Sequence, residues 1–363
     1  MPKVSIVLPI YNVENYLKQC LESVVNQSLR DIEIICVNDG SKDHSLDIMK
    51  QFAQNDSRIK IIDKANSGYG NSMNVGINAA TGEYLGIVEP DDYVDLHMFE
   101  DLARIADQTG ADIVKADFYR FLGEGENLQK KYFALDSHNS LYGKLLDPET
   151  NQEVFKCVMN TWSGIYRLSF LNQYHIRHNE TPGASFQDNG FWFQGFCLSH
   201  KIYFVNHPYY MNRRDNPNSS VHNKAKVYCA NDEYLFIKQF LVNSNLYDKF
   251  KDIFYLKLWH NCCFTYGRIG DEFKLEYLQR VAKDFSENLQ DNVLNNHFFS
   301  ENEKKKISDI VRDYKKYYLQ KQKDNQQNQK QQNLITGCIK CFQQHGFTYT
   351  VKRILVHLGL LNE

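Results

Sequence analysis

The sequence predicts an α/β protein in which a mostly parallel sheet is flanked by helices and followed by a helical C-terminal region. Short apolar runs alternate with amphipathic segments over the first ninety residues or so, as in βαβ units. Each run is followed at once by polar residues and glycines, which mark the end of a strand. From about residue 225 to residue 319, apolar residues recur at helical spacing instead.

The alternation predicts each element in turn. The first strand covers residues 4–9, and the segment 14–26 that follows has Leu17, Leu21 and Val24 on one helical face. Ligands bind outside the carboxyl ends of parallel strands, so we expect the strand-end loops to form one site. The remaining expected elements are strands at 33–37, 59–62 and 84–88 and helices at 46–53 and 72–81.

The composition is that of an ordinary globular protein with an uneven distribution of charge. A chain of 363 residues is long enough for about two domains, and its 42% of hydrophobic residues can build a sizeable core. The net charge of −2 gives no basic field, so nucleic acid is not an expected partner. Residues 301–363 nevertheless carry 12 Lys and Arg against 6 Asp and Glu, which indicates an anionic surface as their partner.

The cysteines and the first residues predict a cytoplasmic protein. The cysteines number nine and are mostly scattered, and no signal peptide precedes the first strand, so we expect free thiols in a reducing compartment. Cys338 and Cys341 have the spacing of zinc ligands but lack a second pair, which disfavours zinc. No run approaches the 18 apolar residues of a transmembrane helix.

Three carboxylates directly follow the strand at 84–88. Glu89, Asp91 and Asp92 would repel one another in a folded chain, and taking them out of water costs several kcal/mol each. A divalent cation offsets both effects, since Mg²⁺ takes oxygen ligands and commonly bridges carboxylates to substrate phosphates. The cluster therefore predicts a cation that holds a diphosphate. The alternative is an acidic loop in which Asp91 or Asp92 caps the next helix.

The other strand ends carry groups that suit a nucleotide diphosphate. Tyr11 can stack on a base, Asp39 can accept a base N–H, and Lys64 can meet a polar or charged ligand group. Gly68 and Gly70 allow close approach of the backbone. Each side chain also has an ordinary alternative: a core aromatic for Tyr11, a turn for Asp39 and a solvated charge for Lys64. No GxGxxG follows the first strand and no GxxxxGK[ST] occurs, which disfavours a dinucleotide fold and a P-loop.

These segments resemble the family-2 inverting glycosyltransferases of the GT-A fold, of the type that builds bacterial surface glycans. The resemblance runs from residue 4 to about residue 93 and implies a nucleotide-sugar donor, most often UDP-linked, with Mn²⁺ or Mg²⁺ as cofactor. Within these residues it implies donor-binding roles for Pro9, Tyr11, Asn12, Glu14, Asp39, Lys64, Gly70, Asn71 and Asp91.

The resemblance also implies metal ligands. Asp92 would be the main ligand, and Asp91 a weaker one that also faces the ribose or sugar. His207 is a further weak candidate, and a structural histidine is its ordinary alternative. The chain departs from the family at two positions, because the first acid of the motif is Glu89 and because Met73 stands where the family often has Arg.

The second half resembles the family more loosely. Residues 186–192 are similar to its Glu-Asp motif, with Gln187 in place of Glu and Asp188 as the implied catalytic base. An inverting transfer needs such a carboxylate to take the proton of the acceptor hydroxyl. N-capping of the following helix is the alternative role of Asp188. In the later segment 209–220, an Arg or a Ser could clamp the leaving diphosphate, with Arg213 as the candidate, since arginine binds phosphate oxygens bidentately.

The expected catalytic domain spans residues 1–222. Its first half, 1–95, binds the nucleotide sugar, and its second half, 96–222, binds the acceptor and carries the base.

Three further parts are expected C-terminal to it. Residues 223–320 are helical, and 321–333 form a polar linker or a solvated helix extension. Residues 334–363 predict a basic amphipathic helix. It either lies on an anionic membrane, such as the inner face of the cell membrane, or packs on the body or on a second subunit of a homo-oligomer.

We therefore expect an enzyme that transfers a hexose or N-acetylhexosamine from a UDP-sugar to a hydroxyl of a surface glycan or a lipid-linked oligosaccharide. Two alternatives remain open. A nucleotidyltransferase should have a Gly-, Arg- or Lys-rich phosphate loop where this chain has Pro9 to Asn12, which argues against it. A glycan-binding or nucleotide-sugar-binding scaffold that has lost catalysis is supported only by Gln187.

Overall fold

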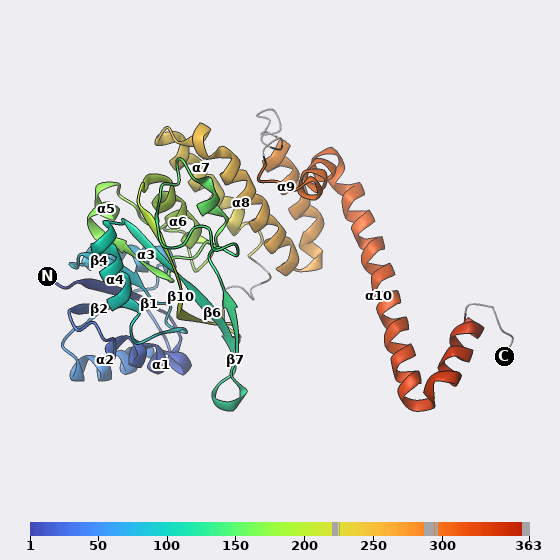
Figure 1. Ribbon diagram of the computed structural model, residues 1–363, viewed down its shortest axis with the longest axis horizontal. Helices are drawn as coiled ribbons and strands as arrows, with labels where there is room; N and C mark the ends of the chain where they lie inside the picture. Colours follow the sequence, from blue (N-terminus) through green and yellow to red (C-terminus); the bar gives the residue numbers. More distant parts are fainter. Residues whose placement is uncertain (220–223, 225, 287–293, 295–296, 358–363) are drawn as a thin grey trace. The chain divides into compact units, whose positions relative to one another are not determined.

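The computed structural model describes residues 1–219, 224, 226–286, 294 and 297–357. The chain divides into two compact units, Met1–Ile269 and Gly270–Glu363 (Figure 1). The first unit contains the whole sheet and the helices packed on it, and the second unit is helical in its described residues.

The sheet of the first unit joins two groups of parallel strands. In the described residues it has ten strands, and its main path runs β3-β2-β1-β4-β9-β6-β10-β5. Strands β1 to β4 are parallel, β6 and β10 are parallel, and β9 lies antiparallel between the two groups. The strands are β1 Val4–Ile10, β2 Ile32–Asp39, β3 Ile59–Lys64, β4 Tyr84–Ile87, β5 Tyr93–Val94, β6 Ile113–Leu122, β7 Gln129–Phe133, β8 Leu145–Leu146, β9 Gly164–Arg167 and β10 Ile202–Arg213.

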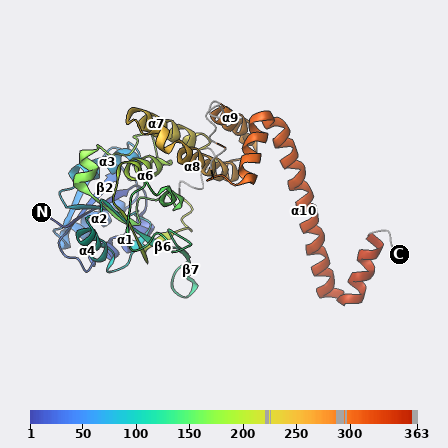
Figure 2. The same cartoon turned by 45° about the horizontal axis from the view of Figure 1, so that its top comes forward.

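Helices cover both faces of this sheet (Figures 1 and 2). One face packs against α1 (Glu14–Val25), α2 (Ser45–Asn55) and α4 (Met98–Thr109), with the even-numbered residues of β1 in the same buried core as Leu21, Met49 and Leu102. The other face carries α3 (Tyr69–Ala79) and α6 (Gln187–Leu198). Alternation of side chains along the strands buries both faces, as expected for parallel strands under two helical layers.

Gly76 shows how closely α3 lies on the sheet. A Cβ atom at this position would be 2.3 Å from Cγ1 of Val7, so any side chain there would push the helix away from β1. The position of α3 matters because its first residues, Tyr69 to Ser72, include cleft-lining side chains.

The helices after the sheet divide between the two units. Helices α7 (Cys229–Asn243) and α8 (Tyr247–Arg268) belong to the first unit, as does the short α5 (Leu168–Gln173). The second unit contains α9 (Lys274–Ser286) and α10 (Glu301–His357). The region expected at 223–320 therefore contributes helices to both units. Short 3-10 segments lie at Gly125–Asn127, Gln152–Lys156 and Asp271–Phe273.

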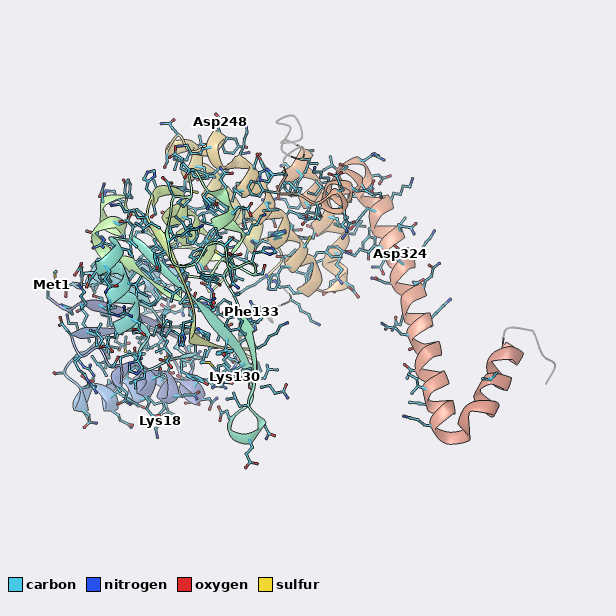
Figure 3. The ribbon with its side chains drawn as sticks, in the orientation of Figure 1. Met1, Lys18, Lys130, Phe133, Asp248 and Asp324 are labelled. Carbon is cyan, nitrogen blue, oxygen red and sulfur yellow. The ribbon has the colours of Figure 1, made fainter. Side chains whose placement is uncertain are left out.

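Residues 321–333 lie inside α10, so the structure favours a solvated helix extension over a linker. Asp324 lies on this stretch, whose side chains are drawn in Figure 3. Pairs four residues apart, such as Lys305 with Asp309 at 2.9 Å, support a helix of this polar composition. Most side chains of residues 334–357, and all of 358–363, lie outside what the structure describes. No helix among the described residues has the length and apolarity that crossing a bilayer requires.

Candidate active site

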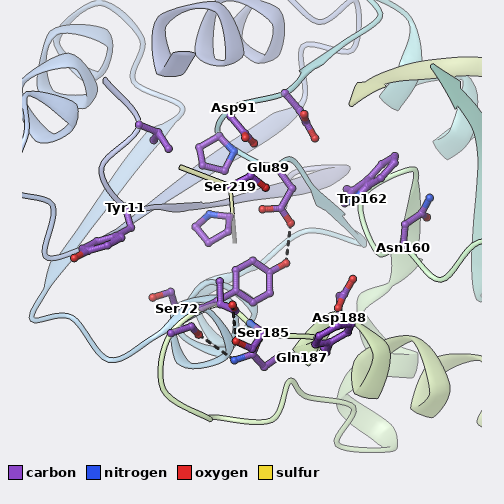
Figure 4. A pocket seen from close by; sticks show the side chains of 18 of the residues that line it. Tyr11, Ser72, Glu89, Asp91, Asn160, Trp162, Ser185, Gln187, Asp188 and Ser219 are labelled. Carbon is purple, nitrogen blue, oxygen red and sulfur yellow. Dashed lines mark hydrogen bonds between the residues drawn. The ribbon is translucent and has the colours of Figure 1, made fainter. Parts of the chain in front are cut away.

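A cleft of about 700 Å³ opens where the carboxyl ends of β1, β2 and β4 meet the start of α6 and the end of β10. Figure 4 shows Tyr11 on one side, Asn160 and Trp162 on the opposite side, and Glu89 between them. Several residues expected to act on substrate line this cleft: Pro9, Tyr11, Asp39, Asp91, Asp92, Asp188 and Arg213.

Tyr11 and Asp39 have the geometry expected of a base-binding pair. The Tyr11 ring is 45% exposed and lines the cleft, so it is not a core aromatic. Asp39 is buried, and its Oδ1 and Oδ2 accept backbone N–H groups of Ser67 at 2.8 Å and Gly68 at 3.0 Å. The Lys64 ammonium also pairs with Oδ1, which leaves a lone pair of Oδ2 for a ligand. Lys64 therefore supports Asp39 and is neither a cleft-lining nor a freely solvated charge.

Asn12 and Glu14 hold two strand-end loops together. Asn12 has a positive φ of 51°, and its Oδ1 accepts the N–H of Lys42 at 2.8 Å. The Glu14 carboxylate accepts the N–H of His44 at 2.8 Å. Neither side chain lines the cleft. Asn12 and Glu14, which were predicted to contact the donor, therefore stabilise the loop that presents Tyr11 in this structure.

Gly70 and Asn71 join α3 to the segment that precedes α6. A Cβ atom at Gly70 would be 2.0 Å from the carbonyl oxygen of Asn179, so only glycine allows this approach. Asn71 donates to the Glu180 carboxylate at 2.9 Å. Neither residue lines the cleft. Gly70 does allow a close backbone approach, as expected, but the group that approaches it is the backbone of Asn179 and not a ligand.

Asp92 is the most buried acid of the β4 loop. It is 1% exposed, its Oδ1 accepts the backbone N–H of Arg213 at 2.6 Å, and its Oδ2 accepts the Asn212 amide at 3.0 Å. Burial, and then the charge of Asp91, raise the pKa of Asp92 well above its ordinary value. Strand β10 therefore fixes the orientation of this carboxylate, and neither Asp91 nor Asp92 is a helix cap, since α4 begins at Met98.

Glu89 and Asp91 complete the acidic loop. Oε1 of Glu89 accepts the Tyr69 hydroxyl at 2.8 Å, and the Asn216 amide donates to Asp91 at 2.9 Å. Burial raises the pKa of Glu89 to about 8, and the charges of Asp91 and Asp188 add to this shift. None of the loop's three acids forms an ion pair with a residue that the structure describes, so the cleft concentrates negative charge that a cation would neutralise.

The donor set fits a hard divalent cation held mainly by its substrate. All three groups are carboxylates, which suit Mg²⁺ or Mn²⁺. Within the described ranges, no three His, Cys, Asp or Glu side chains are arranged as a complete metal cage. A cation bound at such a site would take one or two carboxylates and fill its other positions with phosphate oxygens and water. His207 is not a member of the set, because it is exposed, lies against Tyr209 at 4.3 Å and does not line the cleft.

Asp188 has the features of a general base. It lies in the first turn of α6 and lines the cleft, and burial raises the pKa of its carboxyl to about 6. Its Oδ1 accepts only the N–H of Asn189, at 3.1 Å. The N-cap position belongs to Phe186, which makes no side-chain cap bond, so Asp188 is not a helix cap. A carboxylate with this pKa is ionised near neutral pH and still basic enough to take a proton.

Gln187 organises the loop in front of this base. Its Nε2 donates to the Thr181 hydroxyl at 2.8 Å and to the Gly183 carbonyl at 3.0 Å. Its Oε1 accepts the N–H of Ser185. A glutamate could not donate these bonds, because an ionised carboxylate only accepts. The change from Glu to Gln is therefore matched by a loop that requires an amide, and it gives no support to a loss of catalysis.

Arg213 has a different role from the predicted phosphate clamp. Its side chain is 2% exposed and lies 4.7 Å from the rings of both Tyr16 and Phe121. Its Nη2 donates to Gln19 at 2.6 Å, and its Nε to the backbone oxygen of Asp91 at 3.0 Å. The guanidinium is therefore saturated by the protein and supports the acidic loop.

Several cleft residues were not singled out from the sequence. Trp162 stacks on Tyr210 with ring centroids 4.3 Å apart, and Tyr69 reaches Glu89 from the first turn of α3. An unusually high content of Tyr and Phe was the only general signal for aromatic walls. The others lie in loops or at the ends of strands, with no local motif to mark them: Asn160, Ser185, Lys226 and Arg120.

Comparison with known proteins agrees with this geometry. A family model for glycosyl transferase family 2 matches residues 5–175. The uncharacterized glycosyltransferase EpsJ of Bacillus subtilis is 32% identical over 240 residues, 65% of this chain and 67% of EpsJ. The cholesterol galactosyltransferase of Borreliella burgdorferi is 30% identical over 274 residues, 70% of this chain and 73% of the relative. The chain therefore belongs to glycosyl transferase family 2.

The solved structures define the fold. The crystal structure of S. aureus TarS 1-349 in complex with UDP-GlcNAc matches with a TM-score of 0.63 at 19% identity, covering 77% of this chain and 80% of TarS 1-349. The protein is thus a glycosyltransferase with the GT-A fold, and the predictions of family and fold class are confirmed.

Proposed function

We propose that the protein is an inverting, metal-dependent glycosyltransferase. It transfers a hexose or N-acetylhexosamine from a UDP-sugar to a hydroxyl of a surface glycan or lipid-linked oligosaccharide. The observation that carries the proposal is the joint placement of Tyr11, Asp39, the acidic loop and Asp188 around one cleft. TarS, a similar structure, was crystallised with UDP-GlcNAc and with UDP, which supports a uridine nucleotide as donor.

The donor would bind with its base beside Tyr11. The ring stacks on the base, and the remaining acceptor position of Asp39 takes a base N–H. Asp91 and Asp92 would hold the cation, which stabilises the negative charge of the diphosphate as it leaves. These residues come from the carboxyl ends of β1, β2 and β4, where a parallel sheet presents its ligand site.

Asp188 acts on the acceptor. Its carboxylate takes the proton of the acceptor hydroxyl as that oxygen attacks the sugar carbon from the face opposite the diphosphate. The Asn189 N–H holds Oδ1, and no side chain among the described residues donates to the carboxylate, so it is available to the acceptor. The family assignment argues against the nucleotidyltransferase alternative, and the structural fit of Gln187 argues against a dead scaffold.

UDP release from a panel of UDP-sugars tests the proposal. At least one donor should yield UDP in the presence of Mn²⁺ or Mg²⁺, and a chelator should stop the release. Calorimetry should show that Asp92→Ala abolishes metal-dependent UDP binding. Asp95→Ala is the matched control, because Asp95 is an exposed carboxylate near the motif that does not line the cleft. UDP release that resists the chelator, or unchanged UDP affinity in Asp92→Ala, would contradict the metal assignment.

Two further parts of the proposal concern the acceptor side. Association with an anionic membrane surface through residues 334–363 remains a prediction, as do homo-oligomerisation and a cytoplasmic location. A lipid-linked acceptor would give membrane association a purpose, and the name of the Borreliella burgdorferi relative shows that a family member uses a lipid acceptor.

A further inference from the structure

Two arginines of the cleft wall, Arg120 and Arg214, have no anionic partner among the residues that the structure describes. Arg120 lies near the end of β6, and Arg214 follows the last residue of β10. Both line the cleft, and neither forms an ion pair or a side-chain hydrogen bond with a residue that the structure describes. The Nε of Arg120 is buried without an acceptor. A buried donor without an acceptor is unfavourable, so an acceptor group of a ligand would be favoured at this position.

Arg213, which also lines the cleft, differs from Arg120 and Arg214 in this respect. Arg213 has acceptors on three sides, whereas the Arg120 guanidinium lies 4.3 Å from the ring of Phe133 and meets no carboxylate. Phe133 is on β7, the neighbour of β6 (Figure 3). Burial lowers the pKa of Arg120, and the charge of Arg214 lowers it further, so the two cations lie close enough to repel each other. An anion between them would remove that repulsion.

Arg120 lies on a different strand from the residues that would bind the base. In the sheet order, β4 and β9 lie between β1, which ends just before Tyr11, and β6, which carries Arg120. Arg120 is also close to the aromatic wall that faces Tyr11. Its guanidinium is 6.0 Å from the ring of Phe118, and Phe118 packs edge-on against Trp162 at 4.8 Å.

We propose that Arg120 and Arg214 bind an anionic oxygen group, a phosphate or a carboxylate, on the acceptor glycan beside Trp162. Arginine forks match both groups in geometry and charge. The proposal rests on the proposed function, because it assigns the substrate class of the acceptor end of the same cleft. An acceptor that carries such a charge would be selected over a neutral sugar at this wall.

Binding of small probes to the full-length protein tests this assignment. Ligand-observed NMR titrations would compare methyl glucoside, methyl glucuronide and glucose 6-phosphate, each with and without saturating UDP. We expect at least one charged probe to bind tenfold or more tightly than methyl glucoside. Comparison of the two charged probes shows whether the site takes carboxylate or phosphate. We expect Arg120→Ala and Arg214→Ala each to reduce the preference for charge to less than threefold.

Arg104→Ala is the matched control. Arg104 is a half-exposed arginine on α4, outside the cleft, so its loss removes the same charge without changing the wall. Thermal melting of each variant shows whether it is folded, and Arg120→Gln is the second choice should Arg120→Ala fail to fold. Equal affinity of the wild type for neutral and charged probes would overturn the proposal, and so would a charge preference that survives in folded variants of both arginines.

UDP distinguishes an acceptor site from a diphosphate site. If saturating UDP displaces the charged probe, and Arg120→Ala weakens UDP binding tenfold, the pair serves the donor and the proposal is wrong. If the wild type binds no UDP and releases none from any donor, the proposed function fails, while the titrations without UDP still report on the arginine pair.

Discussion

The donor and acceptor halves of the cleft differ in how completely their polar groups are satisfied. On the donor side, the Asp39 carboxylate accepts two backbone N–H groups and pairs with Lys64. On the acceptor side, the buried Nε of Arg120 and the buried Nδ2 of Asn160 have no hydrogen-bond acceptor among the described residues. The first wall is therefore organised before any ligand arrives, and the second has bonding capacity left for one.

This difference matches what each half must recognise. The same nucleotide is used in many transfer reactions, so the wall that binds its base can be rigid before the donor binds. A rigid wall avoids the entropy cost of ordering it on binding. Acceptors differ between glycans. A buried polar group without a hydrogen-bond partner disfavours any ligand that cannot form a hydrogen bond with it. Substitutions on the donor side should therefore affect stability and binding together, and those on the acceptor side should affect catalysis or binding with little loss of stability.

The largest effect is expected for Asp188→Asn. Loss of the general base should lower kcat by ~10²–10⁴, since an amide cannot take the acceptor proton. UDP affinity, measured by calorimetry, should change little, because Asp188 lies away from the base-binding pair. Wild-type turnover in this variant would remove Asp188 from the role of base.

The pH dependence of the wild type tests the same residue. With a pKa of about 6, Asp188 is protonated below that pH, so kcat should fall about tenfold per pH unit on the acid side. The folded-state pKa lies above the ordinary value of 3.8, so the ionised carboxyl destabilises the fold as pH rises from about 4 and does so fully above about 6. Asp188→Asn should therefore melt at a higher temperature than the wild type at pH 7, with the difference vanishing near pH 4.

A smaller effect on binding is expected for Asp39→Asn, with a cost in stability. One N–H donor of the Ser67–Gly68 turn would face an amide N–H₂, and Lys64 would lose its counter-charge. UDP affinity should fall about tenfold, and melting should show a loss of about 1–3 kcal/mol. Asp63→Asn is the control, since Asp63 is the penultimate residue of the neighbouring strand β3 and does not line the cleft. Unchanged stability with lost UDP binding would contradict a donor wall that is organised in advance.

The first half of the fold could be predicted from the sequence because its signals are local. The expected strand 4–9 ends one residue before β1 does, and the expected helix 14–26 ends one residue later than α1. Tyr11, Asp39 and the acids were found because each directly follows a strand, and parallel strands bring their ends together. Helix α3 was expected at residue 72 but begins at Tyr69, because Gly68, with φ 94°, already turns the chain into it.

The acceptor wall depends on pairings between distant residues. Strand β10 pairs with β6 from about ninety residues away, and a bulge near Pro208 shifts the register between them. That register decides how the two arginines at the end of β10 are used, although both line the cleft. Arg213 is buried and supports the acidic loop, whereas Arg214 has no ion pair among the described residues. Two adjacent arginines in a sequence give no sign of this division. The amide donors of Gln187 likewise serve a loop whose path the sequence does not specify.

Among these variants, Gln187→Glu should have the smallest effect on activity. It tests whether the loop before Asp188 needs an amide. The carboxylate would face the Thr181 and Gly183 carbonyls without a proton to donate, so folding should lose about 1–3 kcal/mol at pH 7, measured by chemical unfolding. This loop closes on the donor side through the bond from the Tyr69 N–H to the Gly183 carbonyl, at 3.1 Å. Gln187→Met is the control, because it removes the amide donors without adding a buried charge. A Gln187→Glu variant that is as stable as the wild type and more active would contradict this role of the amide. The acceptor wall would then depend less on this loop than its contacts indicate.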